Sequence, residues 1–155
     1  TVHEERRLVD HSREQLFDVV SDVDSYQTFL PWCERSIVHE RNESNTESRA
    51  ELHVGFRGIS ERYISKVTMQ RPSSIQVESV DSDLFEQLNS TWILQTGPRE
   101  NQCWVTCKVE FRFRSALYNQ VASVFLDEVV KKMIQAFENR CVALAAARGG
   151  GGGGR

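Results

Sequence analysis

The chain has 155 residues, of which 26% are charged, and a formal net charge of -3 at pH 7. This length predicts one domain that can bury a sizeable core. The slightly acidic balance argues against a dedicated nucleic-acid-binding domain, which normally carries a strongly basic patch, and no run of about 20 apolar residues is present to span a membrane.

The two ends of the chain differ from its middle. The sequence starts at Thr1 without a methionine, so a targeting segment would not be visible in it. Residues 149–155 are glycines followed by Arg155, a composition typical of a linker, and we exclude them from the fold. We therefore expect one domain over residues 1–148 and a glycine-rich tail over residues 149–155.

The first thirty residues predict a strand and two short helices. Residues 1–10 suit an edge strand. Ser12 then offers a helix N-cap, and Gln15, three residues on, completes a capping box. Apolar residues at helical spacing extend this helix to about Val20. A second helical segment is expected over residues 22–29, ending before Pro31 because the residue before proline disfavours helical geometry.

From Cys33 onward the hydrophobic period changes to two, which is the pattern of half-buried strands. Strands are predicted over residues 50–56, 62–70, 75–80, 84–96 and 102–114, separated by short polar turns. The last is the clearest, because every second residue from Val105 to Phe113 is apolar. Such a series predicts an antiparallel meander.

After Ser115 the pattern becomes helical and stays so to about Ala147, with a broad apolar stripe along one side. A helix of this length would measure about 48 Å and could cross a whole sheet. The expected fold class is α+β, with a curved antiparallel sheet of about six to seven strands wrapped around one long C-terminal helix. One helix cannot fill the concave side of a curled sheet, so this geometry predicts a pocket between the two.

The four cysteines, Cys33, Cys103, Cys107 and Cys141, are expected to be reduced and buried, as in an intracellular protein. On one strand, Cys103 and Cys107 would lie about 13 Å apart, too far for a disulfide.

Four stretches of sequence resemble one protein family in the same order. They are FDVVSDVDSYQTFLPWC at residues 17–33, ELHVGFRGISERY at 51–63, LFEQLNSTW at 84–92 and FRFRSALYNQVASVFLDEVV at 111–130. Together they are similar to the coenzyme Q-binding proteins of the START / polyketide-cyclase superfamily, and the resemblance extends from Arg6 to Arg148.

The resemblance implies a helix-grip fold that binds coenzyme Q (ubiquinone) as a lipid and performs no known chemistry on it. It also implies a location on the matrix side of the mitochondrial inner membrane, as a peripheral protein. There the family acts as a lipid carrier or chaperone for respiratory electron transport and quinone biosynthesis. Respiratory complexes or a quinone-biosynthesis assembly would be the partners, and no nucleic acid is expected.

The candidate ligand contacts are apolar residues predicted to face the pocket. Trp32 suits either a lid at the pocket mouth or a core residue under a turn. Tyr63 and Trp92 each carry a polar edge that needs a partner when buried, which could be a quinone carbonyl or a neighbouring backbone group. The full set is Trp32, Leu52, Val54, Phe56, Tyr63, Leu88, Trp92, Val121, Phe125, Val129 and Met133.

Four residues are candidates for contact with a membrane surface. Phe56 and Arg57 fall at the tip of a predicted hairpin, where an exposed aromatic residue suits an interfacial anchor. Lys131 and Lys132 on the long helix could face acidic headgroups, at about 1 kcal/mol each, or belong to an ordinary solvated helix face.

Two other functions stay open. A cyclase or aromatase could use the same pocket, although His53 alternates away from it and the adjacent Asp127 and Glu128 do not face each other on a helix. We expect no catalytic residue, metal or catalytic cofactor. The second alternative is a ribosome-associated factor like bacterial relatives of the family, for which Arg112 and Arg114 would supply a basic outer face.

Overall fold

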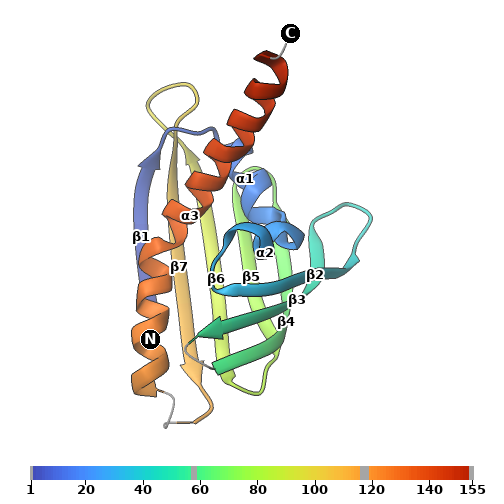
Figure 1. Ribbon diagram of the computed structural model, residues 1–155, viewed down its shortest axis with the longest axis vertical. Helices are drawn as coiled ribbons and strands as arrows, with labels where there is room; N and C mark the ends of the chain where they lie inside the picture. Colours follow the sequence, from blue (N-terminus) through green and yellow to red (C-terminus); the bar gives the residue numbers. More distant parts are fainter. Residues whose placement is uncertain (1, 57–58, 116–118, 154–155) are drawn as a thin grey trace.

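The computed structural model describes residues 2–56, 59–115 and 119–153, which form one antiparallel sheet with helices on one side of it (Figure 1). The elements follow the expected order of a strand, short helices, further strands and a long C-terminal helix. In chain order they are β1 (Val2–Val9), α1 (Arg13–Ser21), the 3-10 turn η1 (Val23–Ser25), α2 (Tyr26–Phe29), β2 (Cys33–Arg41), β3 (Glu47–Phe56), β4 (Ile59–Gln70), β5 (Ser74–Asp81), β6 (Phe85–Thr96), β7 (Cys103–Phe113) and α3 (Asn119–Gly153).

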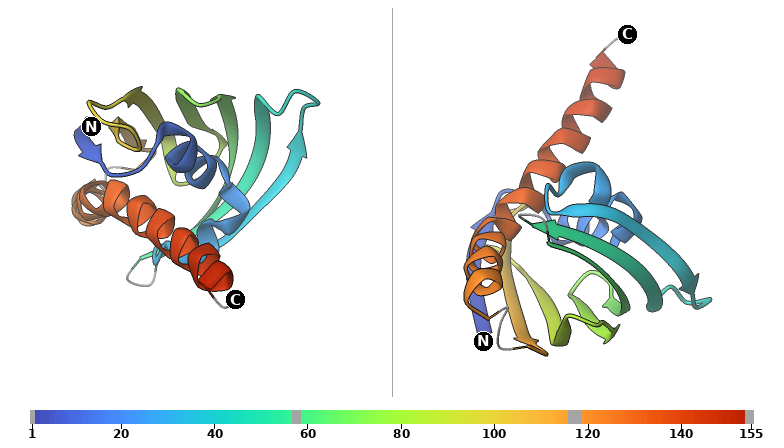
Figure 2. Two further views of the ribbon diagram at one scale, coloured as in Figure 1. Left: turned by 90° about the horizontal axis from the view of Figure 1, so that it is seen from above. Right: turned by 60° about the horizontal axis from the view of Figure 1, so that its bottom comes forward.

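The sheet has seven strands in the order β1-β7-β6-β5-β4-β3-β2. Strands β2 to β7 form the predicted meander, and β1 pairs antiparallel with β7, which leaves β1 at an edge as expected. The sheet curls strongly, and all three helices lie on its concave side (Figure 2). The predicted α+β class and helix-grip layout are therefore confirmed.

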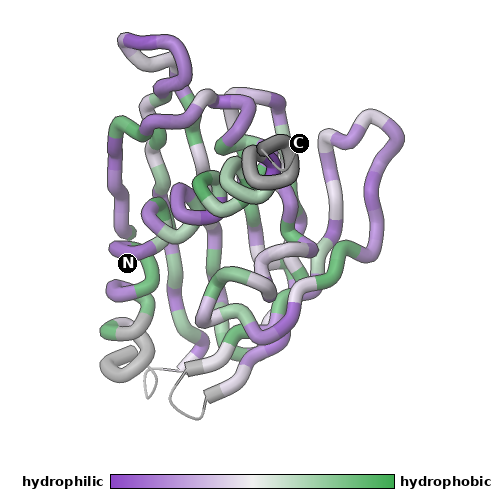
Figure 3. The backbone as a smooth tube through the Cα atoms, turned by 45° about the horizontal axis from the view of Figure 1, so that its top comes forward, coloured by the Kyte–Doolittle hydropathy of each residue, from purple (hydrophilic) through white to green (hydrophobic). Residues whose placement is uncertain are grey.

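Alternation along the strands sorts residues between the two faces of the sheet, because successive side chains of a strand point to opposite sides. In β7 every second residue from Cys103 to Phe113 is buried, and those between are half-buried or exposed. The same alternation buries Tyr63, Ser65, Val67 and Met69 of β4. Coloured by hydropathy, the strands change between hydrophobic and hydrophilic along their length (Figure 3).

The first helix begins with the predicted capping box. The Ser12 hydroxyl accepts from the Gln15 backbone N–H at 3.1 Å, and the Gln15 side chain accepts from the Ser12 N–H at 2.9 Å. The second helical segment is split into η1 and α2. It ends at Phe29 because Leu30, which precedes Pro31, adopts an extended conformation.

The long helix α3 contacts α1, β1 and β7. Buried residues at three- and four-residue spacing, including Val130, Ile134, Phe137 and Cys141, form its inner side. The helix runs through Gly153, so the expected end near Ala147 is wrong. Gly149 to Gly153 form the end of α3, although each glycine costs about 1 kcal/mol relative to alanine in a helix.

The four cysteines are buried and free, as predicted. Among the helices in the described ranges, none combines the length and the apolar character that crossing a bilayer requires.

Candidate functional site

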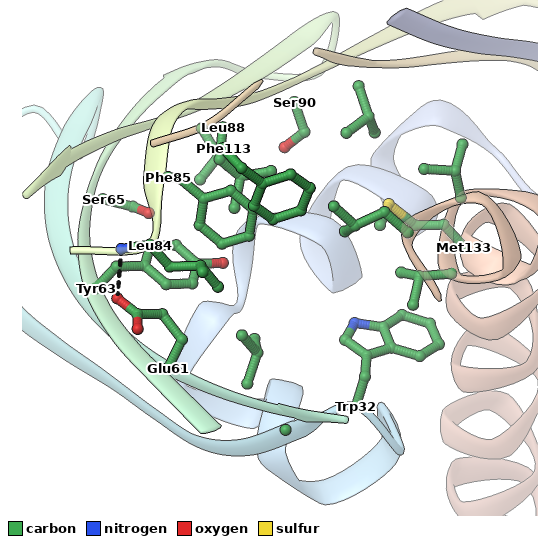
Figure 4. Close-up of a pocket in the computed structure, with 17 residues that line it drawn as sticks. Trp32, Glu61, Tyr63, Ser65, Leu84, Phe85, Leu88, Ser90, Phe113 and Met133 are labelled. Atoms are coloured by element: carbon green, nitrogen blue, oxygen red, sulfur yellow. Dashed lines mark hydrogen bonds between the residues drawn. The ribbon is translucent and has the colours of Figure 1, made fainter. Parts of the chain in front are cut away.

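An apolar cavity of about 130 Å³ lies between the concave face of the sheet and α3 (Figure 4). Strands β3 to β7 supply one wall, α3 supplies the opposite wall, and Trp32, between α2 and β2, lies at one side. The residues of the α3 wall are Leu126, Val129, Val130 and Met133. The pocket predicted from the fold is therefore present.

A second cavity of about 100 Å³ adjoins the first. The two share Trp32, Val54, Tyr63 and Met133, together with Val77 and Ser90. From there the smaller cavity extends toward Tyr26, Trp92 and Phe137. The empty space thus continues along the concave face from the larger cavity to the packed core under α1 and α2.

Eight predicted ligand contacts border these cavities. Those that line the larger one are Trp32, Val54, Tyr63, Leu88, Val129 and Met133. Leu52 and Trp92 line the smaller cavity, which Tyr26 of α2 also borders. Their roles as ligand contacts remain predictions.

Other predicted residues fall outside the described part of the structure. The backbone of Phe56 ends β3 and pairs with Ile59 at the expected hairpin, and Val121 and Phe125 belong to α3. The side chains of these three residues are not described, and Arg57 lies outside the described ranges entirely. Lys131 and Lys132 are described and exposed on α3, and their contact with a membrane remains a prediction.

Sequence reasoning missed the polar residues of the larger cavity, namely Glu61, Ser65 and Ser90. A signal for the serines was present. Ser65 stands between Tyr63 and Val67 on an inward-facing strand side, and Ser90 stands between Leu88 and Trp92 in the same way. A serine at an inward position of an apolar strand is a candidate for ligand contact, because a buried hydroxyl requires a partner.

The two cavity hydroxyls of β4 have no hydrogen-bond partner among the described residues. Ser65 is fully buried and its Oγ is unpaired. Tyr63 is 8% exposed, and its hydroxyl bonds to no described residue. Burial raises the pKa of Tyr63 well above its ordinary value of 10.0. The phenol therefore remains a hydrogen-bond donor at neutral pH.

Glu61 is held at the cavity wall by neighbouring groups. Its Oε1 accepts hydrogen bonds from the Ser82 hydroxyl and the Leu84 backbone N–H, both at 3.3 Å. Figure 4 shows the bond to Leu84 and the side chains of Tyr63, Ser65 and Phe85 gathered on the same side of the cavity. This side is the polar part of an otherwise apolar chamber.

The thiols near the cavities are poor nucleophiles. Burial raises the pKa of Cys33, which borders the smaller cavity, and raises the pKa of Cys107 to about 12. The thiolate is the reactive form of cysteine, so both groups are inert at neutral pH. Cys107 instead packs against α3, with its Sγ 3.8 Å from the Met133 Sδ.

The outer face of the sheet carries ion pairs. Glu51 contacts His39, His53 and Arg62, so His53 lies on the polar side, as predicted. Arg112 pairs with Glu86 at 3.4 Å, and Arg114 donates to the Ser82 carbonyl at 3.0 Å. The expected basic face at Arg112 and Arg114 is therefore partly neutralised, because an acidic residue of β6 stands beside Arg112.

Comparison with known proteins identifies the family to which the chain belongs. The family model described as polyketide cyclase / dehydrase and lipid transport matches residues 9–138. The coenzyme Q-binding protein COQ10 homolog B, mitochondrial, of Xenopus laevis is 39% identical over 140 residues, which cover 89% of this chain and 57% of that protein. The chain thus spans little more than half the length of this relative.

A bacterial relative carries a different name. The ribosome association toxin RatA of Rickettsia prowazekii is 31% identical over 137 residues, covering 86% of this chain and 91% of that protein.

Solved structures have the same architecture. A START superfamily protein from Mycobacterium smegmatis superposes with a TM-score of 0.79 at 18% identity, covering 92% of this chain and 98% of that one. The Zhui aromatase/cyclase of a Streptomyces species gives a TM-score of 0.74, also at 18% identity, covering 96% and 94% of the two chains. At this identity the likenesses establish the fold alone.

Proposed function

Because the chain belongs to the polyketide cyclase / dehydrase and lipid transport family, we propose that it is a lipid-binding protein whose ligand is ubiquinone. The observation that carries this proposal is the cavity, whose walls are apolar apart from a few hydroxyls and one carboxylate. A hydrophobic chamber with a small number of placed polar groups is the usual design of a site for a largely apolar molecule. The name of the Xenopus relative supplies the ligand class.

The dimensions of the cavity indicate which part of the ligand it encloses. A dry apolar cavity of roughly 150 Å³ suffices for benzene, so a chamber of about 130 Å³ fits a small ring and little more. A long isoprenoid tail must extend through the adjoining cavity or beyond α3. Each buried methylene contributes about 0.8 kcal/mol before association costs, so tail burial supplies most of the affinity.

We propose a carrier role without catalysis. Most wall residues, such as Val54 and Val129, can shield a lipid but cannot move protons. The Glu61 carboxylate of the wall is bonded to Ser82 and Leu84, and burial raises the pKa of the nearby Cys33 and Cys107 thiols. The protein would present ubiquinone for respiratory electron transport and quinone biosynthesis. The names of the relatives support a mitochondrial location, and within the mitochondrion we propose a peripheral position on the matrix side of the inner membrane.

The test is native mass spectrometry, with organic extraction, on protein purified from a ubiquinone-producing host. We expect near-stoichiometric ubiquinone in the wild type and a strong loss in Val54→Gln, because Val54 borders both cavities. The matched control is Val38→Gln, which changes a half-buried valine of β2 outside both cavities. A folded wild-type protein that arrives empty and ignores ubiquinone-loaded liposomes would contradict the proposal.

The similarity to RatA favours a second candidate, association with the ribosome. Binding to ribosomal RNA needs unpaired cations, whereas Arg62, Lys66, Lys108 and Arg112 on the outer face each contact a carboxylate. Co-sedimentation with ribosomal subunits in moderate salt, by protein that extracts without quinone, would move the assignment to this candidate.

A further inference from the structure

The two unpaired hydroxyls of β4 point to a specific subsite within the cavity. Tyr63 and Ser65 are two residues apart on the same side of one strand, so their Cα atoms lie roughly 7 Å apart. Ser65 is completely buried, and Tyr63 is more than nine-tenths buried. Both line the larger cavity, and in Figure 4 both oxygen atoms lie toward its interior.

The Ser65 Oγ is a buried hydroxyl without a partner; such groups are uncommon and cost free energy, because they have lost their hydrogen bonds to water. The other polar groups nearby are engaged differently. The Glu61 Oε1 is occupied by Ser82 and Leu84. A ligand with polar atoms would supply the hydrogen-bond partners that Tyr63 and Ser65 lack.

Aromatic side chains adjoin these hydroxyls. The ring of Phe85 lies 6.1 Å from the ring of Tyr63, edge to face, and 5.0 Å from the ring of Phe113. Aromatic rings at these separations form a surface on which a further planar ring can pack. A planar ring with oxygen substituents matches both features, since its face can meet Phe85 and its oxygens can meet Tyr63 and Ser65.

We propose that the oxygenated ring of the ligand binds head-inward at Tyr63 and Ser65, and that these two hydroxyls bind its ring oxygens. This inference rests on the proposed function and assigns the orientation of the lipid. The tail then leaves on the opposite side, past Trp32 and Met133, which Figure 4 places across the cavity and which also border the smaller cavity.

The chemistry of a hydroxyl suits both oxidation states of a quinone. Serine and tyrosine hydroxyls donate one hydrogen bond and also accept hydrogen bonds. They can donate to the carbonyl oxygens of the quinone and accept from the hydroxyls of the quinol. A subsite built from Tyr63 and Ser65 would therefore hold the ring in either state, as a carrier requires.

The experiment compares two ligands. One is a ubiquinone with a single isoprene unit, and the other is squalene, an isoprenoid hydrocarbon with neither ring nor oxygen. Tyr63→Phe and Ser65→Ala each remove one hydroxyl, and we expect each to weaken ubiquinone binding by roughly three- to tenfold. Squalene binding should stay within about twofold of the wild type, because no hydrogen bond is lost.

Two variants serve as matched controls. Ser36→Ala removes a buried serine hydroxyl that accepts from the Gln27 N–H and donates to the Asp24 carbonyl, and Ser48→Ala removes a buried serine hydroxyl on β3. Neither should change ubiquinone binding. Infrared spectroscopy gives a second readout, in which the quinone carbonyl stretch is lowered on the wild type and shifts back in Tyr63→Phe.

The possible outcomes distinguish failure of the proposed lipid-binding function from failure of the head-inward orientation. Wild-type protein that binds neither ligand would overturn the proposed function. Wild-type protein that binds ubiquinone, with both β4 variants retaining full affinity and an unshifted carbonyl stretch, would overturn the head-inward subsite alone. Equal loss of squalene and ubiquinone in the variants would also overturn it, because the hydroxyls would then act through the shape of the cavity.

Discussion

Two regions of the concave face contain similar side chains but are packed differently. In the core region, under α1 and α2, the ring of Phe137 lies 5.0–5.4 Å from those of Tyr26, Phe29 and Trp92. In the cavity region, Phe85 likewise contacts Tyr63 and Phe113, but the larger cavity, of about 130 Å³, lies beside these rings.

Hydrogen bonding separates the two regions as clearly as packing does. The Tyr26 hydroxyl donates to the Val20 carbonyl, whereas the Tyr63 hydroxyl has no partner among the described residues. In the core region the tyrosine hydroxyl is already bonded within the protein, although Tyr26, Trp92 and Phe137 also border the smaller cavity. In the cavity region the Tyr63 hydroxyl is left for a ligand. Stability and binding are therefore assigned to different parts of one sheet, as expected where a functional site is kept at some cost in stability.

The largest expected effect tests packing in the core region. Phe137→Ala removes a ring that is 2% exposed and contacts three other aromatic rings. We expect the free energy of unfolding to fall by about 3–5 kcal/mol, from lost burial and a new void. Leu88→Ala, at a half-buried position on the cavity, should cost at most about 2 kcal/mol, since fewer contacts are lost.

Urea denaturation of the two variants measures both values. Equal losses at Phe137 and Leu88 would mean that the regions are packed alike, and the comparison would then be wrong.

The inward pattern of the strands was predictable from sequence, whereas the position of the cavity was not. Alternation in β4 and β7 reveals which residues face inward, and the spacing of Val129 and Met133 reveals the inner side of α3. A period of two does not reveal how far along a strand the helix crosses it. Leu52 and Val54 thus share one face of β3, yet Leu52 borders the smaller cavity alone and Val54 borders both.

The polar residues of the site were harder to predict for a related reason. Ser65 and Glu61 belong to a strand in which only the apolar inward residues were predicted to contact a ligand. Phe85 belongs to a strand from which only Leu88 and Trp92 were predicted to do so. Whether an inward serine finds a partner depends on the neighbouring strand and on the curvature of the sheet, and both are set by contacts distant in sequence. The capping box of α1, by contrast, involves residues three apart and was fully predictable.

The two buried tyrosines should contribute differently to the stability of the protein. Tyr26→Phe leaves the buried Val20 carbonyl without its donor, and the free energy of unfolding should fall by about 1–2 kcal/mol. Tyr63→Phe removes a hydroxyl with no described partner, so the empty protein should change by less than about 0.5 kcal/mol. The measurement is again urea denaturation. A large loss in Tyr63→Phe would reveal a structural bond at that hydroxyl.

Replacing two buried serines by alanine should have different effects on the free energy of unfolding. The Ser36 hydroxyl accepts from the Gln27 N–H and donates to the Asp24 carbonyl, both at 3.1 Å, so Ser36→Ala should destabilise by about 1 kcal/mol. Ser65→Ala removes an unpaired buried hydroxyl, which should leave the ligand-free protein equally stable or up to about 1 kcal/mol more stable. Thermal unfolding of protein from which lipid has been extracted measures the effect of both substitutions. Destabilisation by Ser65→Ala would indicate that the Ser65 hydroxyl already has a hydrogen-bond partner.

The smallest expected effect concerns the outer face behind the cavity region. Glu51 of β3 accepts hydrogen bonds from His53 and His39 and lies near Arg62, and these contacts lower its pKa from 4.5 to about 2. A carboxyl whose pKa is lower in the folded state stabilises the protein above its unfolded pKa, and this contribution is lost as the pH falls toward the folded value. The Tm advantage of the wild type over Glu51→Gln should therefore be full above about pH 4.5 and should shrink as the pH falls toward 2.

Because Glu51 joins β3 to β2 and β4 on the outer side, acid should loosen these strands before it affects the packing around Phe137. Hydrogen exchange at pH 3 with earlier opening of β3 than of β7 would support that order, and a wild-type advantage that stays constant from pH 6 to 2 would remove Glu51 as its cause.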